Sequence, residues 1–262
     1  MTNTDINIDI NLDLQEVSKN PVLGKVYLVG AGPGDAGLMT LKGKALLETC
    51  DVVLYDALVS DEILAMINPI AEKIHAGKRR GHHSLLQEET TQLLIEKAQN
   101  HAIVVRLKGG DPFIFGRGGE EMADLRSAGI TVEVVPGITS GIAAPAYAGI
   151  PLTHRDFSSS VIFVTGHESA GKYRPQINWK AIAQGAETIV VYMGLHNLGE
   201  IITNLTSAGL PESTPVALIR QGTRPDQSEL IGCLGNIVKL VQDSQFTPPA
   251  IAVIGNIVNF RG

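Results

Sequence analysis

The sequence predicts an α/β fold of two α/β domains: an N-terminal domain with a mostly parallel sheet, a C-terminal domain with a mixed sheet, and the active site in the cleft between them. Three observations favour this fold class. Short apolar runs alternate with glycine turns and helix-like stretches from Gly24 onward, a stretch of small residues at 138–151 interrupts the alternation, and four new apolar runs follow it. Such alternation is typical of a parallel sheet covered by helices on both faces.

The first domain is predicted over residues 22–137. Its strands are expected at the apolar runs KVYLVGAG, DVVLYD, AIVVRLKGGDP and TVEVVPG. Helices are expected near residues 41–50, 87–100 and 119–128. In open α/β sheets, ligands bind beyond the carboxyl ends of the strands. The loops GAGPGD, YDALVS and KGGDP, which follow the first three runs, are therefore candidates for a binding site.

The second domain is predicted over residues 138–262. Its strands are expected at SVIFVTG, ETIVVYMG, TPVALIRQG and PPAIAVIGNIV. The MGL turn that follows the second of these runs is a fourth candidate binding loop.

Residues 1–21 differ from the rest of the chain, because Ile and Leu alternate with Asp and Asn through DINIDINLDL. A period of two fits a half-buried strand. However, Asp and Asn disfavour strands, and terminal segments are usually loose unless they dock. We therefore expect a flexible N-terminal tail with no catalytic role.

Charge and cysteine content exclude several classes of protein. The formal net charge of -6 argues against nucleic-acid binding, which depends on clustered Lys and Arg. Cys50 and Cys233 form no disulfide framework, and neither they nor the pair His82 and His83 have metal-ligand spacing, so we expect no metal. No apolar run has the length of a membrane span, and no secretory signal is recognisable. We expect a cytoplasmic protein without a membrane partner.

The loop GAGPGD superficially suggests a dinucleotide fingerprint and hence an NAD-dependent oxidoreductase. Its glycines at 30, 32 and 34 are spaced GxGxG, whereas the fingerprint requires GxGxxG. Pro33 also removes a backbone donor from the loop, and a phosphate cradle needs free N–H groups. The loop is therefore either a ligand loop for a molecule without phosphate or a tight strand-to-helix turn.

The most informative segment is RLKGGDPFIFGRGGEE at 106–121. Its glycine pairs allow the backbone to approach a ligand closely, and Asp111 can accept two hydrogen bonds from a diol such as a ribose. The alternative for Asp111 is a helix cap in a turn. That alternative does not explain why Arg117, Glu120 and Glu121 follow on a second Gly-rich turn.

Together, VGAGPGD, YDALVS, GKRRGHHS and RLKGGDPFIFGRGGEE, in this order, resemble the tetrapyrrole methylase family. The resemblance extends from about Gly24 to the C-terminus. Its GRGGEE half is similar to the members that methylate uroporphyrinogen III, as distinct from those that methylate later corrinoid intermediates, diphthine precursors or ribosomal RNA.

The resemblance implies that S-adenosyl-L-methionine is the cofactor, S-adenosyl-L-homocysteine is the product, and the protein is a homodimer with a small-molecule tetrapyrrole substrate. This cofactor has no phosphate, so a proline in the first loop is compatible with it. The residues expected to bind it, each in a matching local motif, are Pro33, Gly109, Gly110, Asp111, Ile114, Thr139, Ser140, Met193 and Gly222.

The resemblance also implies a C-methyltransferase that adds two methyl groups to uroporphyrinogen III and forms precorrin-2. Asp56 matches the family's proton acceptor and Lys78 its proton donor. The alternatives are a strand-end turn residue for Asp56 and an ordinary solvated charge for Lys78. Arg117 and Arg155 are expected to bind the carboxylates of the substrate, with Glu120 orienting Arg117 or accepting from pyrrole N–H groups. The competing functions are methylation of another precorrin and transport of a tetrapyrrole without turnover.

Overall fold

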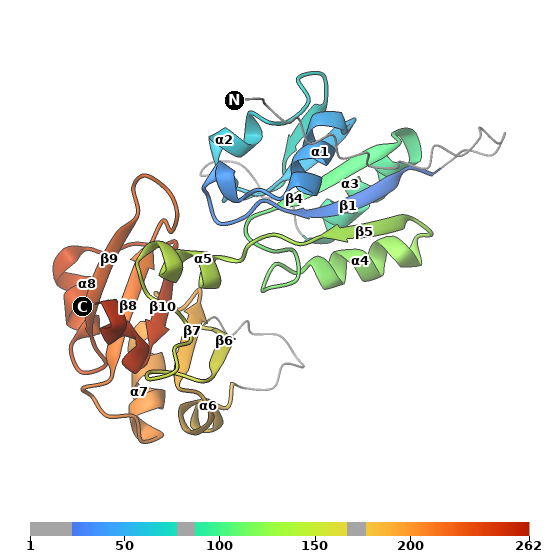
Figure 1. The fold of residues 1–262 in the computed structure, drawn as a ribbon. Helices are drawn as coiled ribbons and strands as arrows, with labels where there is room; N and C mark the ends of the chain where they lie inside the picture. Colours follow the sequence, from blue (N-terminus) through green and yellow to red (C-terminus); the bar gives the residue numbers. More distant parts are fainter. Residues whose placement is uncertain (1–22, 78–86, 167–176, 262) are drawn as a thin grey trace, which may run out of the picture.

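The computed structural model describes residues 23–77, 87–166 and 177–261, and they form two lobes with a five-stranded sheet each (Figure 1). Residues 1–21, for which a flexible tail is predicted, lie outside the described residues. No helix in the described ranges is long and apolar enough to cross a membrane.

The first sheet has the order β3-β2-β4-β1-β5, and all its pairings are parallel. Its strands are β1 (Lys25–Gly30), β2 (Val52–Tyr55), β3 (Glu72–His75), β4 (Ile103–Lys108) and β5 (Thr131–Val135). The connecting helices are η1 (Ala36–Leu38), α1 (Leu41–Thr49), α2 (Asp61–Leu64), α3 (Gln87–Asn100) and α4 (Gly118–Ser127).

Alternate residues of each strand in this sheet point to opposite faces, and both faces are buried. Val29 packs with Leu47 of α1 on one face, whereas Leu28 packs with Leu94 of α3 and Leu125 of α4 on the other. A strand buried on both faces must be apolar at nearly every position. The continuous apolar runs of the sequence are therefore explained by two helical layers.

The second sheet has the order β6-β7-β10-β8-β9, with β6 and β7 parallel and the other pairings antiparallel. Its strands are β6 (Val161–Thr165), β7 (Thr188–Tyr192), β8 (Pro215–Arg220), β9 (Ser228–Cys233) and β10 (Ala250–Ile254). The helices are α5 (Ser140–Tyr147), α6 (Trp179–Gly185), α7 (Leu198–Ser207), α8 (Ile237–Ser244) and η2 (Asn256–Arg261). The parallel and the mixed sheet confirm the predicted fold class.

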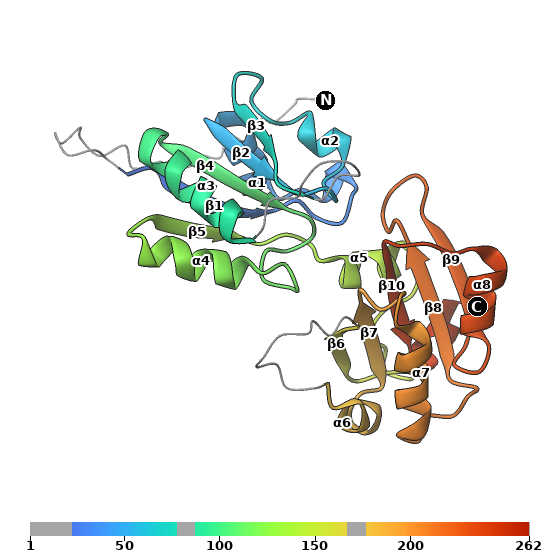
Figure 2. The same ribbon diagram turned by 180° about the vertical axis from the view of Figure 1, so that it is seen from behind.

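The small-residue stretch at 138–151 is not an interruption of structure, because it forms α5. This helix packs on β7 and β10 of the second sheet and lies on the side of that lobe nearest the first lobe (Figure 2). Its small residues permit a close approach: a Cβ on Gly141 would lie 2.2 Å from the Tyr192 hydroxyl. The strands of the two sheets lie on either side of this stretch, and the boundary at 137/138 stays a prediction.

Candidate active site

Three loops of the first lobe meet where β1, β4 and β5 end. Gly32 and Gly110 exchange two backbone hydrogen bonds, with N···O distances of 3.1 and 2.7 Å. A Cβ on Gly137 would lie 2.3 Å from the Gly110 carbonyl oxygen and 2.7 Å from the Cα of Gly30. Since real Cβ atoms do not approach so closely, the glycines of these motifs are required for the loops to pack together.

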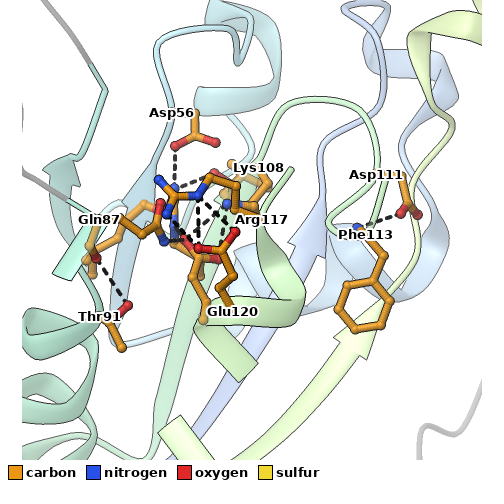
Figure 3. Close-up of polar contacts among 12 residues, drawn as sticks. Asp56, Gln87, Thr91, Lys108, Asp111, Phe113, Arg117 and Glu120 are labelled. Atoms are coloured by element: carbon orange, nitrogen blue, oxygen red, sulfur yellow. Dashed lines mark hydrogen bonds and ion pairs between the residues drawn. The ribbon is translucent and has the colours of Figure 1, made fainter. Parts of the chain in front are cut away.

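Asp111 organises the loop that follows β4 (Figure 3). One carboxylate oxygen accepts from the backbone N–H groups of Phe113 and Ile114 at 2.8 and 3.2 Å, and the other accepts from Gly137 N–H at 3.0 Å. Asp111 thus closes a turn, but it caps no helix, because α4 begins at Gly118 with Arg117 as its N-cap. An ionised carboxylate offers about four lone-pair positions, so three bonds leave room for one donor from a ligand.

The second lobe brings Thr139 and Ser140, at the start of α5, next to this loop. A Cβ on Gly110 would lie 3.8 Å from the Cα of Thr139 and 3.9 Å from the backbone nitrogen of Ser140. The Tyr192 hydroxyl lies 2.7 Å from the Thr139 hydroxyl and accepts from Gly141 N–H at 2.8 Å. Burial of the Tyr192 ring raises the pKa of its hydroxyl, so this hydroxyl is a neutral hydrogen-bonding group near pH 7.

Met193 follows Tyr192 directly, with a φ of 53° and a half-exposed side chain. A positive φ is uncommon outside glycine and often marks a functional turn. Gly222, after β8, packs so closely on α5 that an added Cβ would lie 2.3 Å from the Cβ of Ala144. Gly222 therefore lies against α5, and Met193 directly follows Tyr192, whose hydroxyl contacts the start of that helix.

Two contacts join the first loop to the second lobe. The backbone N–H of Asp35, two residues after Pro33, donates to the Thr223 hydroxyl at 3.1 Å, and the Tyr147 hydroxyl donates to the Asp35 carboxylate at 2.6 Å. The predicted cofactor residues from Pro33 to Gly222 thus belong to one connected set of loops from both lobes.

A cluster of charged side chains lies behind the end of β2. Arg106 of β4 donates to Asp56 at 2.5 Å and to Glu121 of α4 at 3.1 Å. Lys108 lies 3.1 Å from both carboxylate oxygens of Glu121, and Gln87 donates to Glu121 at 2.9 Å. The side chains of Arg106, Lys108 and Glu121 are 5%, 3% and 0% exposed, whereas that of Asp56 is 28% exposed. Only Asp56 in this set of ions is available to a ligand.

Burial decides the electrostatics of this cluster. Burial lowers the pKa of Lys108, and the neighbouring guanidinium of Arg106 lowers it further. For Arg106, burial also opposes the charged form, but the carboxylates of Asp56 and Glu121 outweigh it and raise the pKa. Two cations and two carboxylates therefore balance each other in a region nearly closed to water.

The predicted substrate-binding residues are distributed more widely. Arg117, at the start of α4 with a φ of 60°, makes a bidentate pair with Glu120, and both side chains are about half exposed. This contact matches the expectation that Glu120 orients Arg117. Arg155 is exposed on the loop before β6, where Ser158 bonds to Thr188 at the start of β7. Met193 follows the opposite end of β7, so the described chain does not bring Arg155 to the other candidates. Lys78 lies outside the described residues.

Sequence reasoning assigned no role in the site to Arg106, Lys108, Glu121 or Tyr192, although it singled out the segment 106–121. The burial of Arg106 and Lys108 could have been predicted from the sequence. They are two residues apart in the apolar strand IVVRLK, so both side chains lie on the same buried face. Buried cations require carboxylate partners. No local feature of the sequence indicates that Glu121 is buried while Glu120 is exposed.

Metal chemistry receives no support from the part of the chain that the structure describes, where no three His, Cys, Asp or Glu side chains gather as metal ligands. A shallow hollow between α6 and α7, lined by Trp179, Asn197 and Asn204, contains none of the predicted site residues. The connected loops offer no phosphate cradle, because Pro33 has no N–H and the backbone N–H groups of Gly32, Gly110 and Asp35 already donate within the protein.

Comparison with known proteins identifies the family of the chain. The sequence profile of the family described as Tetrapyrrole (Corrin/Porphyrin) Methylases matches residues 25–238. The chain is 66% identical over 242 residues to the uroporphyrinogen-III C-methyltransferase of Synechocystis sp., with 92% of each chain covered. It is 49% identical to a siroheme synthase of Actinobacillus pleuropneumoniae, of which it spans 49% of the length.

The fold matches a crystal structure of uroporphyrin-III C-methyl transferase from Thermus thermophilus complexed with S-adenyl homocysteine. The TM-score is 0.78 at 39% identity, and the match covers 90% of this chain and 99% of that one. Sequence profile, close relative and fold therefore agree, and the chain belongs to the tetrapyrrole (corrin/porphyrin) methylases.

Proposed function

We propose that this chain is a uroporphyrinogen-III C-methyltransferase, which transfers two methyl groups from S-adenosyl-L-methionine to carbons 2 and 7 of uroporphyrinogen III and yields precorrin-2 and S-adenosyl-L-homocysteine. The observation that carries the proposal is 66% identity, over 92% of both chains, to a protein of that name. The GRGGEE segment at 116–121 supports the same substrate over a later precorrin.

S-adenosyl-L-methionine, when bound, supplies a methyl group on a positively charged sulfur. The residues that would hold it are the connected loop residues Pro33, Gly109, Gly110, Asp111, Ile114, Thr139, Ser140, Met193 and Gly222. Asp111 already accepts three backbone N–H groups and keeps one acceptor position for a ligand hydroxyl.

The attacking atom is a pyrrole carbon of the substrate, so the chain needs no nucleophile of its own. Its main contribution is then orientation, which can supply about 7 to 11 kcal/mol. Each methylation leaves a cationic tetrapyrrole that must lose a proton. We assign Asp56 as the acceptor, because its carboxylate is the partly exposed member of the charge cluster. Such a base contributes a factor of about 10² to 10⁴. Lys78 is the proposed proton donor.

We assign the substrate carboxylates to Arg117, with Glu120 holding its guanidinium. Arg155 is a proposed second partner, although it lies at the other end of β7 and this chain alone does not bring it to Arg117. Exposed ion pairs are worth only about 0.2 to 1 kcal/mol each, so useful affinity requires several of them. We further propose a homodimer that works in the cytoplasm. Light scattering coupled to gel filtration tests the dimer, and a mass of one chain refutes it.

The decisive experiment incubates the protein anaerobically with uroporphyrinogen III and S-adenosyl-L-methionine carrying a labelled methyl group. We expect a product with two labelled methyl groups and two equivalents of S-adenosyl-L-homocysteine. Calorimetric titration with S-adenosyl-L-homocysteine and with NAD separates the methyltransferase from an oxidoreductase. Binding of the tetrapyrrole without any labelled product indicates a carrier and refutes the proposal.

A further inference from the structure

The charge cluster contains a carboxylate that no step of the proposed reaction uses. Glu121 is fully buried, yet one of its oxygens accepts from Gln87, Arg106 and Lys108, and the other lies 3.1 Å from Lys108. Burying a carboxylate is costly unless it is paired and hydrogen-bonded. A role for Glu121 is therefore to be sought in its effect on the position and charge of the side chains that it binds.

Arg106 connects Glu121 to the surface. Its Nε binds Glu121, its Nη2 binds Asp56, and its Nη1 reaches the carbonyl oxygens of Leu54 and Leu107 at 3.5 and 3.3 Å. A planar guanidinium held along two edges has a single orientation. Because Arg106 is 4% exposed, it is not available to the carboxylates of a tetrapyrrole. It affects the surface of the site only through Asp56, whose carboxylate it holds in place.

Lys108 would disturb this arrangement if no carboxylate neutralised its charge. It lies two residues from Arg106 on the same face of β4, and the cation of Arg106 lowers its pKa. Without Glu121, Asp56 would be the only carboxylate of the cluster, and both Arg106 and Lys108 would attract it. The position of the Asp56 carboxylate would then no longer depend on Arg106 alone. Glu121 thus neutralises Lys108 and fixes Arg106 at the same time.

We infer that Glu121 is a positioning residue that acts through Arg106 to hold the Asp56 carboxylate where it accepts the proton released after methyl transfer. The inference rests on the proposed function, in which Asp56 is the proton acceptor. A base must lie within about 2.6 to 3.2 Å of the atom that it deprotonates, and a misplacement of about 1 Å can cost about 10²-fold in rate.

The test compares two double variants that differ in a single property. Lys108→Met with Glu121→Gln removes the buried pair of charges but keeps an acceptor for Arg106 Nε. Lys108→Met with Glu121→Leu removes the same charges and the acceptor. Replacing a buried ion pair by well-packed neutral residues is often neutral or stabilising, so both variants should fold. Asp124→Asn, which removes an exposed carboxylate from the same helix, is the matched control and should match the wild type.

We expect the double variant with Glu121→Gln to keep a kcat within about threefold of the wild type. The double variant with Glu121→Leu should fall about 10²-fold in kcat, while its Kd for S-adenosyl-L-homocysteine stays the same. Its Tm should fall by several degrees, because the buried Nε of Arg106 loses its acceptor. A purely structural role predicts equal kcat for the two variants when the assay temperature is well below both Tm values, and that result overturns the inference. A loss of about 10²-fold in the folded variant that keeps the acceptor also overturns it, whether or not the variant with Glu121→Leu folds.

The wild-type reaction separates this inference from the proposed function. A wild-type protein that adds no methyl group to uroporphyrinogen III refutes the function and the inference together. A wild-type protein that adds two methyl groups, beside two double variants of equal kcat, refutes the inference alone.

Discussion

The Tyr192 hydroxyl joins the start of α5 to the second sheet, and its removal offers a test of how the two lobes form one site. Tyr192→Phe keeps the ring, which lies 4.9 Å from that of Phe115 and 5.8 Å from that of Phe163 between centroids. It removes the acceptor of Gly141 N–H and the partner of the Thr139 hydroxyl. Gly141 and Thr139 are buried, so water does not readily replace the lost oxygen.

An unsatisfied buried donor costs about 1 to 3 kcal/mol. Since about 1 kcal/mol shifts the Tm of a protein of this size by about 2 to 4 °C, we expect Tyr192→Phe to lower the Tm by several degrees. Thr139 then loses its fixed orientation beside Gly110, and the Kd for S-adenosyl-L-homocysteine should rise about fivefold, which corresponds to about 1 kcal/mol. Differential scanning calorimetry and isothermal titration measure the two effects.

A double-mutant cycle with Thr139→Val is the control for this prediction. The two hydroxyls contact each other, so the double variant should cost less than the sum of the single variants. Strict additivity, or a Tyr192→Phe protein with the Tm and ligand affinity of the wild type, would refute the reasoning that this hydroxyl holds the start of α5.

Three further predictions concern the site and the core. Asp56→Asn should reduce kcat by about 10² to 10⁴, the worth of a general base, with little change in the Kd for S-adenosyl-L-homocysteine; unchanged turnover removes Asp56 from the mechanism. Gly137→Ala should destabilise the protein by about 1 to 3 kcal/mol through overpacking against Gly110, whereas Gly199→Ala, in a helix with open space around it, should stabilise it by about 0.5 to 1 kcal/mol; equal Tm values for the two variants contradict this. Burial raises the pKa of the Cys50 thiol from 9.0 to about 11. Because this pKa is higher in the folded state, the neutral thiol stabilises the fold fully below pH 9, and that contribution is lost as the pH rises from about 9 to about 11. Urea unfolding should therefore show a larger loss of stability over this range for the wild type than for Cys50→Ala, and parallel losses contradict the burial argument.

Much of the first lobe was predictable because its signals are local. The helix predicted near 87–100 and the strand at DVVLYD coincide with α3 and β2, since apolar periodicity and turn residues act over a few neighbours. The small residues of α5 were misinterpreted, because a helix that packs by close approach has no broad apolar stripe. β9, SELIGC, was missed because it is a half-buried edge strand that carries polar residues.

The candidate site also contains features that the sequence predicts and features that only the fold determines. The glycine loops and the exposed pair of Arg117 and Glu120 follow from contiguous motifs, so the sequence was enough to find them. The contact of Asp111 with Gly137 could not be predicted, because it depends on the approach of the next strand end.

The sequence by itself determined the described strands except β3 and β9, the position of the glycine loops after strand ends, and the family through its contiguous motifs. Only the tertiary structure decided that Glu121 is buried while Glu120 is exposed, that Arg106 bridges Glu121 to Asp56, and that Arg155 lies at the far end of β7 from Met193. The physical reason is the distance along the chain over which each interaction acts. Propensities and periodicity depend on neighbours along the chain, whereas an ion pair depends on strand register and on the rotation of a helix about its axis, which packing across the whole lobe determines.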